Sequence, residues 1–151
     1  MQRLNPFTAA PEGFATLSKV EDYIKKSGLE PGLLALVRVR VSQMNGCAYC
    51  LHMHSEEALA AGEKEVRLHV LNAWHESAMY SDRERAALAW AEALTNIAQT
   101  HAPDDVYEQA KRQFSEKELA NLSIAIAMIN AWNRLAIGAR AHHPADLKRA
   151  A

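Results

Sequence analysis

The chain has 151 residues, of which 49% are hydrophobic and 23% are charged, a balance typical of one compact soluble domain. Its 17 lysines and arginines against 18 aspartates and glutamates leave a formal net charge of −1, which gives no electrostatic reason to expect nucleic acid or an anionic membrane as a partner. No uninterrupted apolar run approaches the roughly 20 residues of a membrane-spanning helix, and the first residues lack the apolar core of a secretory signal, so we expect a cytoplasmic protein.

The beginning of the chain predicts an arm followed by a helix. Two prolines and a glycine with little periodicity lie in the first fifteen residues, so we expect an N-terminal arm over 1–15 that is loosely ordered or lies on a neighbour. We expect one helical domain over 16–151. Apolar residues at helical spacing predict its first helix over 16–27, and Gly28 supplies the stop.

The next segment, 32–45, has two competing periodicities. Residues 37–41 alternate Val-Arg-Val-Arg-Val as in a strand, while the leucines and valines of the whole segment fall at helical spacing. A single strand with nothing to pair with would leave its backbone donors and acceptors unsatisfied, and no other segment offers a partner strand. We therefore predict a helix.

The rest of the chain is predicted to be helical throughout. Ser81 and Ser115 each open a Ser-x-x-Glu capping box, which marks a helix start. The last helix is apolar on nearly every side, so we expect it to be buried all round as a central pillar and expect the protein to form homo-oligomers. These helices cover 47–61, 63–73, 81–99, 104–114 and 116–141. The predicted fold class is all-α, with about seven helices.

Both cysteines of the chain lie in one tetrapeptide, Cys47-Ala48-Tyr49-Cys50. Two cysteines are too few for a disulfide framework of the secreted type. On a helix, residues i, i+3 and i+7 share a face, so we expect Cys47, Cys50 and His54 to share one site if the helix includes all three. A helix N-terminus favours thiolates, and a nearby imidazole can take their proton. The pattern predicts a reactive dithiol.

Two other interpretations of these residues stay open. Cysteines are among the most buried residue types, so both can be packing residues. A zinc site would need His52 as a fourth ligand beside Cys47, Cys50 and His54. Because His52 is two residues from Cys50, roughly 200° around the helix, we expect it to point away from the other three. We therefore expect no metal.

The last helix also carries polar residues among its apolar ones. Asn130, Asn133 and Arg134 predict either a polar network or a subunit contact, or else an exposed helix end.

The sequence around the cysteines resembles a known family. Residues 36–50, which end in Met44-Asn45-Gly46-Cys47-Ala48-Tyr49-Cys50, together with His54, resemble the core of the alkylhydroperoxidase AhpD family within the carboxymuconolactone decarboxylase superfamily. The segments 71–74, 84–90 and 130–135 resemble the same family. The similarity extends over most of residues 15–141.

This resemblance implies an all-helical oligomer that reduces alkyl or hydrogen peroxides with a dithiol and without a metal or flavin cofactor. In the family's scheme the second cysteine, here Cys50, attacks the peroxide, and Cys47 then closes the disulfide. His54 would assist proton movement. A dithiol or protein reductant would restore the thiols.

The sequence departs from the family pattern at one position. The family's proton relay usually includes a glutamate twelve residues before the first cysteine, and Ala35 stands there. Glu57, three residues after His54, and Glu76 can replace it only if the tertiary fold brings them to the site.

Two alternative functions follow from these observations. A lactone decarboxylase of the same superfamily is one, although such members do not depend on a Cys-x-x-Cys pair. The other is a redox-responsive scaffold whose disulfide changes assembly or partner binding with little turnover, an alternative that the alanine at position 35 favours.

Overall fold

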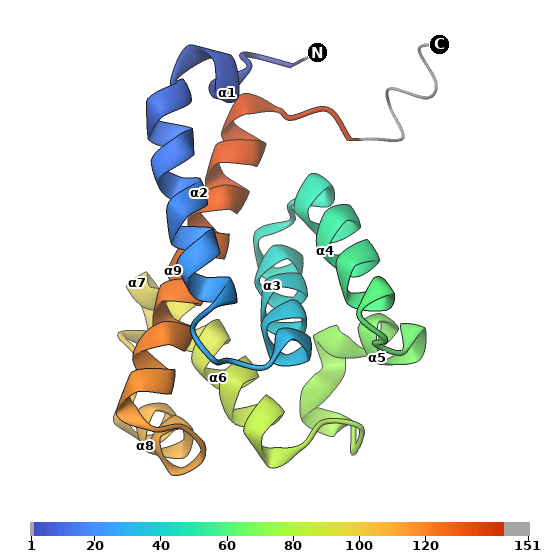
Figure 1. Ribbon diagram of the computed structural model, residues 1–151. Coiled ribbons are helices and arrows are strands. Elements are labelled where there is room, and N and C mark those ends of the chain that lie inside the picture. Colours follow the sequence, from blue (N-terminus) through green and yellow to red (C-terminus); the bar gives the residue numbers. More distant parts are fainter. Residues whose placement is uncertain (1, 144–151) are drawn as a thin grey trace.

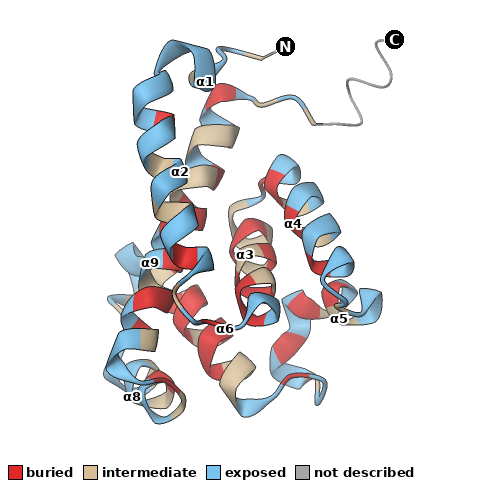
Figure 2. Cartoon of the chain, viewed as in Figure 1, coloured by how far each residue is buried: buried red, intermediate tan, exposed pale blue. Residues whose placement is uncertain are grey.

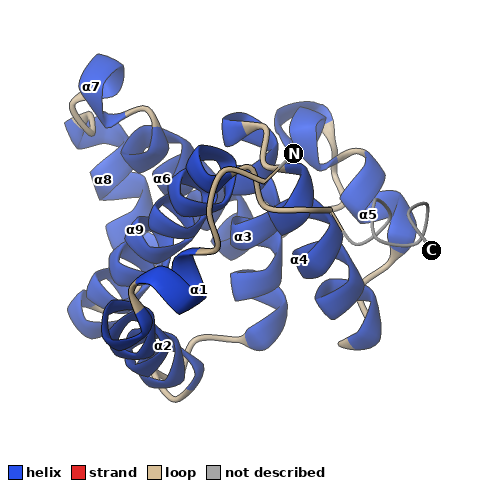
Figure 3. Ribbon diagram, turned by 90° about the horizontal axis from the view of Figure 1, so that it is seen from above, coloured by secondary structure: helices blue, strands red, loops and turns tan. Residues whose placement is uncertain are grey.

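The computed structural model describes residues 2–143, which fold into helices with no strand in that range (Figures 1 and 3). The all-α prediction is confirmed, and each of the seven predicted helices is present. In chain order the elements are α1 (Pro6–Ala9), α2 (Pro11–Lys25), α3 (Pro31–Asn45), α4 (Ala48–Ala60), α5 (Glu65–His69), the 3-10 helix η1 (Leu71–Glu76), α6 (Asp82–Thr95), α7 (Ile97–Thr100), α8 (Asp104–Gln113) and α9 (Glu116–Ala139).

The N-terminal segment differs from the prediction. Pro6 and Pro11 begin α1 and α2 instead of interrupting them, because proline at the first helical position lacks only a donor that would be unpaired there anyway. The backbone N–H of Arg3 donates to the carbonyl of Ala139 at 2.9 Å, which ties the segment to the end of α9. The helices contradict the loosely ordered alternative for residues 6–15, and the alternative of an arm that lies on a neighbour stays a prediction. Residue 1 of that arm and 144–151 of the predicted domain lie outside the described residues.

Two predicted helices are each divided into two. The segment 63–73 becomes α5 and η1, and Ala73 within η1 has non-helical backbone angles. The segment 81–99 becomes α6 and α7, which meet at Asn96. Apolar spacing continues across both breaks, so the periodicity alone does not reveal them.

Helix α3 lies at the centre of the fold and packs against α4, α6, α9 and η1 (Figure 2). Its residues contribute to two apolar clusters. Leu33, Leu34, Val37 and Val41 face the cluster shared with α2, α6, α8 and α9, whereas Leu36 and Val39 face the cluster shared with α4, α5, η1 and α6. Burial on both sides explains why its sequence has no clear polar face.

The two arginines of the ambiguous Val-Arg-Val-Arg-Val segment leave α3 on different sides. Residues 38 and 40 are about 200° apart on a helix. Arg38 pairs with Glu21 of α2 at 2.7 Å, and Arg40 pairs with Glu92 of α6 at 2.8 Å. Each charge is thus neutralised by a neighbouring helix, and the strand-like alternation is compatible with a buried helix.

Helix α9 is only partly buried, so the prediction of burial all round is wrong for the single chain. Ile126 and Ile129 face the core, but Ile124 and Ile137 are 38% and 45% exposed. By length and composition α9 is also apolar enough to cross a membrane, with a mean hydropathy of 1.3 in a window that is 39% buried. A core helix of a soluble protein meets the same criteria, and α9 packs against α2, α3, α4, α6 and α8.

A tight turn joins α3 to α4. Gly46 ends α3 with left-handed backbone angles (φ 68°, ψ 33°), and the N–H of Cys47 donates to the carbonyl of Ser42 at 3.1 Å. Cys47 is then the N-cap of α4, and its sulfur accepts the N–H of Cys50 at 3.3 Å. The conformation of Gly46 therefore determines where the cysteine pair begins.

We expect Gly46→Ala to destabilise the protein by about 1–2 kcal/mol, because a left-handed conformation costs an L-residue about that much. A Cβ at Gly46 would meet no atom within 4 Å, so the cost is conformational and not steric. Gly13→Ala is the control, since Gly13 lies within α2 with equally open space. That change should stabilise by about 0.5 kcal/mol. Urea unfolding midpoints measure both, and equal effects of the two changes would contradict the prediction.

Candidate functional site

The cysteine pair lies at the N-terminus of α4, where the first backbone N–H groups have no carbonyl partner within the helix and favour a negative charge. Cys47 and Cys50 are joined as a disulfide with a Cα–Cα distance of 5.4 Å. Both are buried, with 1% and 2% of their surface exposed. The predicted pairing of two thiols at a helix start is thus present in the fold, inside the protein and not on its surface.

His54 lies one helical turn after Cys50 and is also buried. Its Nδ1 is 2.8 Å from Oε2 of Glu57, which is half-exposed. Burial is the strongest influence on the pKa of His54 and lowers it below the usual value, while the hydrogen bond and the charge of Glu57 act in the opposite direction. The imidazole is therefore neutral at neutral pH and able to accept a proton.

A pair of charged residues, Glu21 of α2 and Arg38 of α3, also influences His54. Arg38 further lowers the pKa of His54, and Glu21 opposes it. Glu21 is held in place by Arg38 at 2.7 Å and by the indole N–H of Trp132 at 2.8 Å. No sequence pattern predicts this group, because Glu21, Arg38 and Trp132 come from α2, α3 and α9 and share no spacing.

The fold brings one of the two replacement carboxylates to the site. Glu57 contacts His54, whereas Glu76 is exposed at the end of η1. Ala35 packs against an apolar cluster together with Leu51 of α4. The position of the family's relay glutamate is therefore apolar here, and the carboxylate next to His54 comes from α4.

His52 does not join the cysteines. It is exposed, and its ring meets the ring of His143 edge-on, with 4.8 Å between centroids. Within residues 2–143, no three histidine, cysteine or acidic side chains are grouped so that they could hold a metal ion. The two sulfur atoms are bonded to each other.

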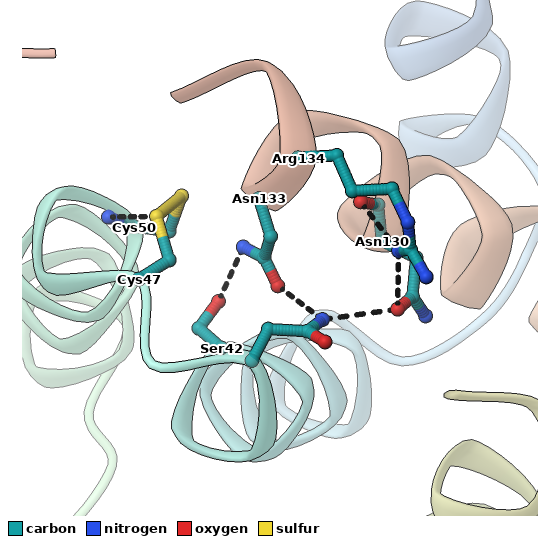
Figure 4. The surroundings of a disulfide bond; sticks show 7 residues. Ser42, Cys47, Cys50, Asn130, Asn133 and Arg134 are labelled. Carbon is teal, nitrogen blue, oxygen red and sulfur yellow. Dashed lines mark hydrogen bonds between the residues drawn. A yellow bond between two sulfur atoms is a disulfide. The ribbon is translucent and has the colours of Figure 1, made fainter. Parts of the chain in front are cut away.

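The polar residues of α9 form a network beside the disulfide, as one of the alternatives predicted (Figure 4). Asn133 is fully buried, and its Nδ2 donates to the hydroxyl of Ser42 at 3.1 Å. Nδ2 of Asn45 donates to Oδ1 of Asn133 at 2.9 Å and to Oδ1 of Asn130 at 3.0 Å. Arg134 donates to Oδ1 of Asn130 at 3.0 Å. The last turn of α3 is thereby joined to α9 next to the cysteines.

Comparison with known sequences identifies relatives over most of the chain. The sequence model of the carboxymuconolactone decarboxylase family matches residues 9–93. The uncharacterized protein YdfG of Bacillus subtilis is 39% identical over 136 residues, which is 90% of this chain and 92% of YdfG.

Solved structures with the same fold include a protein of unknown function from Agrobacterium tumefaciens, a candidate antioxidant defence protein AhpD. It is 41% identical, has a TM-score of 0.92, and the alignment covers 95% of this chain and 99% of that protein. The debrominase Bmp8 has a TM-score of 0.80 at 21% identity, with 90% of this chain and 73% of Bmp8 covered. The similarity to Bmp8 is one of fold.

We expect His54→Gln to reduce the loss of stability on mild acidification. A histidine whose folded pKa is lowered contributes its full stability above the unfolded value, about 6.5, and loses it as the pH falls toward the folded value. Urea midpoints of the wild type should therefore fall between about pH 7.5 and pH 5.5 more steeply than those of the variant. Equal slopes would show that burial of His54 does not favour its neutral form.

The carboxylate of Glu118 contributes to the pH dependence of stability in a lower pH range than His54 does. The backbone N–H of Ser115, with the side chains of Ser115 and Arg83, lowers the pKa of Glu118 to about 2, so its stabilising effect is complete above the unfolded value of 4.5. The range chosen for His54 lies above that value.

Proposed function

Because the chain belongs to the carboxymuconolactone decarboxylase family and has an AhpD-like fold, we propose that it is a thiol-dependent peroxidase that reduces alkyl or hydrogen peroxides. The observation that carries this proposal is the Cys47–Cys50 pair, closed as a disulfide at the N-terminus of α4 with His54 one turn later. A dithiol that closes as a disulfide delivers two electrons to a peroxide.

The cysteine pair reduces the peroxide in two steps, and an external reductant then restores the thiols. The Cys50 thiolate attacks one peroxide oxygen, so that an S–O bond forms, the O–O bond breaks, and the alkoxide or hydroxide leaves as the alcohol or water after protonation. The Cys47 sulfur then attacks the resulting sulfenic acid, so that the S–S bond forms, the S–O bond breaks and water leaves. A dithiol or protein reductant returns two electrons and two protons to the pair.

Proton transfer falls to His54 in this scheme. The neutral imidazole accepts the Cys50 proton and returns it to the leaving oxygen. Glu57 holds Nδ1 of the ring at 2.8 Å, which fixes the ring orientation and partly offsets the effect of burial. Glu57 thereby takes the place of the family's relay glutamate, at whose position this chain has Ala35.

The burial of both cysteines favours a small oxidant. It also argues against a surface disulfide that acts mainly as a docking switch. We further propose that the protein works in the cytoplasm as a homo-oligomer. The exposed apolar residues of α9, among them Ile124 and Ile137, support self-association.

We expect the two cysteine variants to fail at different steps. Cys50→Ser should abolish peroxide reduction. Cys47→Ser should react once and stop as a Cys50 sulfenic acid that dimedone traps, and serine at an N-cap keeps the start of α4 intact. Mass spectrometry after one equivalent of tert-butyl hydroperoxide measures both, with loss of two hydrogens in the wild type as the reference.

Three results would contradict parts of this scheme. Trapping at Cys47 in Cys50→Ser would reverse the order of attack. If the disulfide forms at once but the protein does not reduce further peroxide in the presence of dithiothreitol, the result would favour the redox-responsive scaffold. A wild type in which both thiols survive the peroxide equivalent would exclude the peroxidase.

We expect Glu57→Gln to lower the peroxidase rate by at most about fivefold. Its carboxylate is 56% exposed, and the interaction of an exposed charge is worth up to about 1 kcal/mol. Glu56→Gln removes the same charge one residue earlier and should leave the rate unchanged. Initial rates with a dithiol donor measure both, and equal effects of the two variants would remove Glu57 from the proton pathway.

A further inference from the structure

The buried amides between α3 and α9 have a fixed polarity, which can be traced from one end of the network to the other. Arg134 can only donate, so the atom of Asn130 that it meets is the oxygen. The nitrogen of Asn130 correspondingly donates to the carbonyl of Ile126, which can only accept, at 3.0 Å. The orientation of the Asn130 amide is therefore determined at both of its ends.

The polarity of the network continues from Asn130 through Asn45 to Asn133. Because Asn45 meets the oxygen of Asn130, the atom it presents is its nitrogen. That nitrogen also meets Asn133, so Asn133 turns its oxygen toward Asn45 and its nitrogen toward Ser42. A residue of α9 thus presents an N–H donor, and not an acceptor, at the end of the network nearest the cysteines.

Figure 4 shows that this nitrogen lies on the side of Asn133 that faces the sulfur atoms of Cys47 and Cys50. An amide nitrogen carries two hydrogens, and Ser42 takes one of them. Asn133 and both cysteines are buried, so a hydrogen bond formed here is not weakened by water. A donor in this position interacts more strongly with a negatively charged sulfur than with a neutral thiol.

We propose that Asn133 is a positioning residue that donates its second amide N–H to the sulfur of Cys50 in the reduced protein and stabilises the thiolate. This inference rests on the proposed function in taking Cys50 as the nucleophile. It assigns a role to a residue outside the Cys-x-x-Cys and histidine motif. Asn45, Asn130 and Arg134 maintain the amide orientation on which that role depends.

The test is the pH dependence of Cys50 alkylation by iodoacetamide in the reduced full-length protein, followed peptide by peptide by mass spectrometry. Asn133→Ala removes the donor, and we expect the pH midpoint of Cys50 alkylation to rise by about one unit, equal to about a tenfold loss of thiolate below the midpoint. Asn133→Asp keeps the side-chain shape, replaces the donor by an acceptor and should raise the midpoint at least as far.

Asn121 provides a matched control on the same helix. It is buried to a similar degree, accepts from the hydroxyl of Tyr23 at 2.8 Å and donates to the carbonyl of Ser27 at 3.3 Å. Asn121→Ala should destabilise the fold by removing these bonds and leave the alkylation midpoint of Cys50 unchanged. A comparable shift in Asn121→Ala would assign the effect to loosened packing and overturn the proposal.

The disulfide reduction potential, measured by equilibration with dithiothreitol, is a second readout. A donor that stabilises the reduced form raises the potential, so both Asn133 variants should be harder to reduce than the wild type. An unchanged midpoint in either folded Asn133 variant overturns the inference, even if the wild type reduces peroxide. A shifted midpoint in a protein that turns over no peroxide supports the role of Asn133 and rejects the peroxidase.

Discussion

The burial of α3 on all sides is the constraint on which the rest of the structure depends. Leu36, Val37 and Val41 have no exposed surface, so partner helices must cover every face. The arginines at 38 and 40 can be accommodated only because α2 and α6 each supply a carboxylate. The polar end of the helix, where Ser42 and Asn45 lie, needs hydrogen-bond partners as well, and the amides of α9 provide them.

The site inherits its properties from this arrangement. Because Gly46 turns the chain directly from α3 into α4, the cysteines follow the end of a helix that is buried on all sides, and they are buried themselves. Burial disfavours charge, which keeps His54 neutral and would also disfavour a thiolate. The N–H groups at the start of α4 oppose that penalty for the sulfurs, and Cys50 N–H already donates to Cys47. A base and an activated thiol can then coexist within one helical turn.

Helical periodicity is sufficient to predict the all-α fold, because it depends only on the spacing within each segment. The Cys-x-x-Cys motif predicts two thiols close together at a helix start, where the structure has the Cys47–Cys50 disulfide. The grouping of His54 with both cysteines stays a prediction. Features that depend on contacts between helices were not predictable. The pairing of Glu21 with Arg38 and Trp132 links three elements with no common spacing. The exposed outer face of α9 was also not predictable. Apolar residues show which surfaces can be buried, but not which of them a single chain buries. Prolines near the N-terminus are typical of an irregular arm, but here they begin helices.

The alanine at position 35 affects the path of the proton in the proposed mechanism. Ala35 packs with Leu51 into an apolar cluster between α3 and α4, where a carboxylate would be desolvated and would tend to stay protonated. Glu57 is instead 56% exposed, so a proton that reaches it from His54 exchanges with water. In this chain the proposed relay therefore leads outward along α4. Between α3 and α4, Ala35 and Leu51 contribute apolar packing, and the donor that we propose for the Cys50 sulfur comes instead from Asn133 of α9.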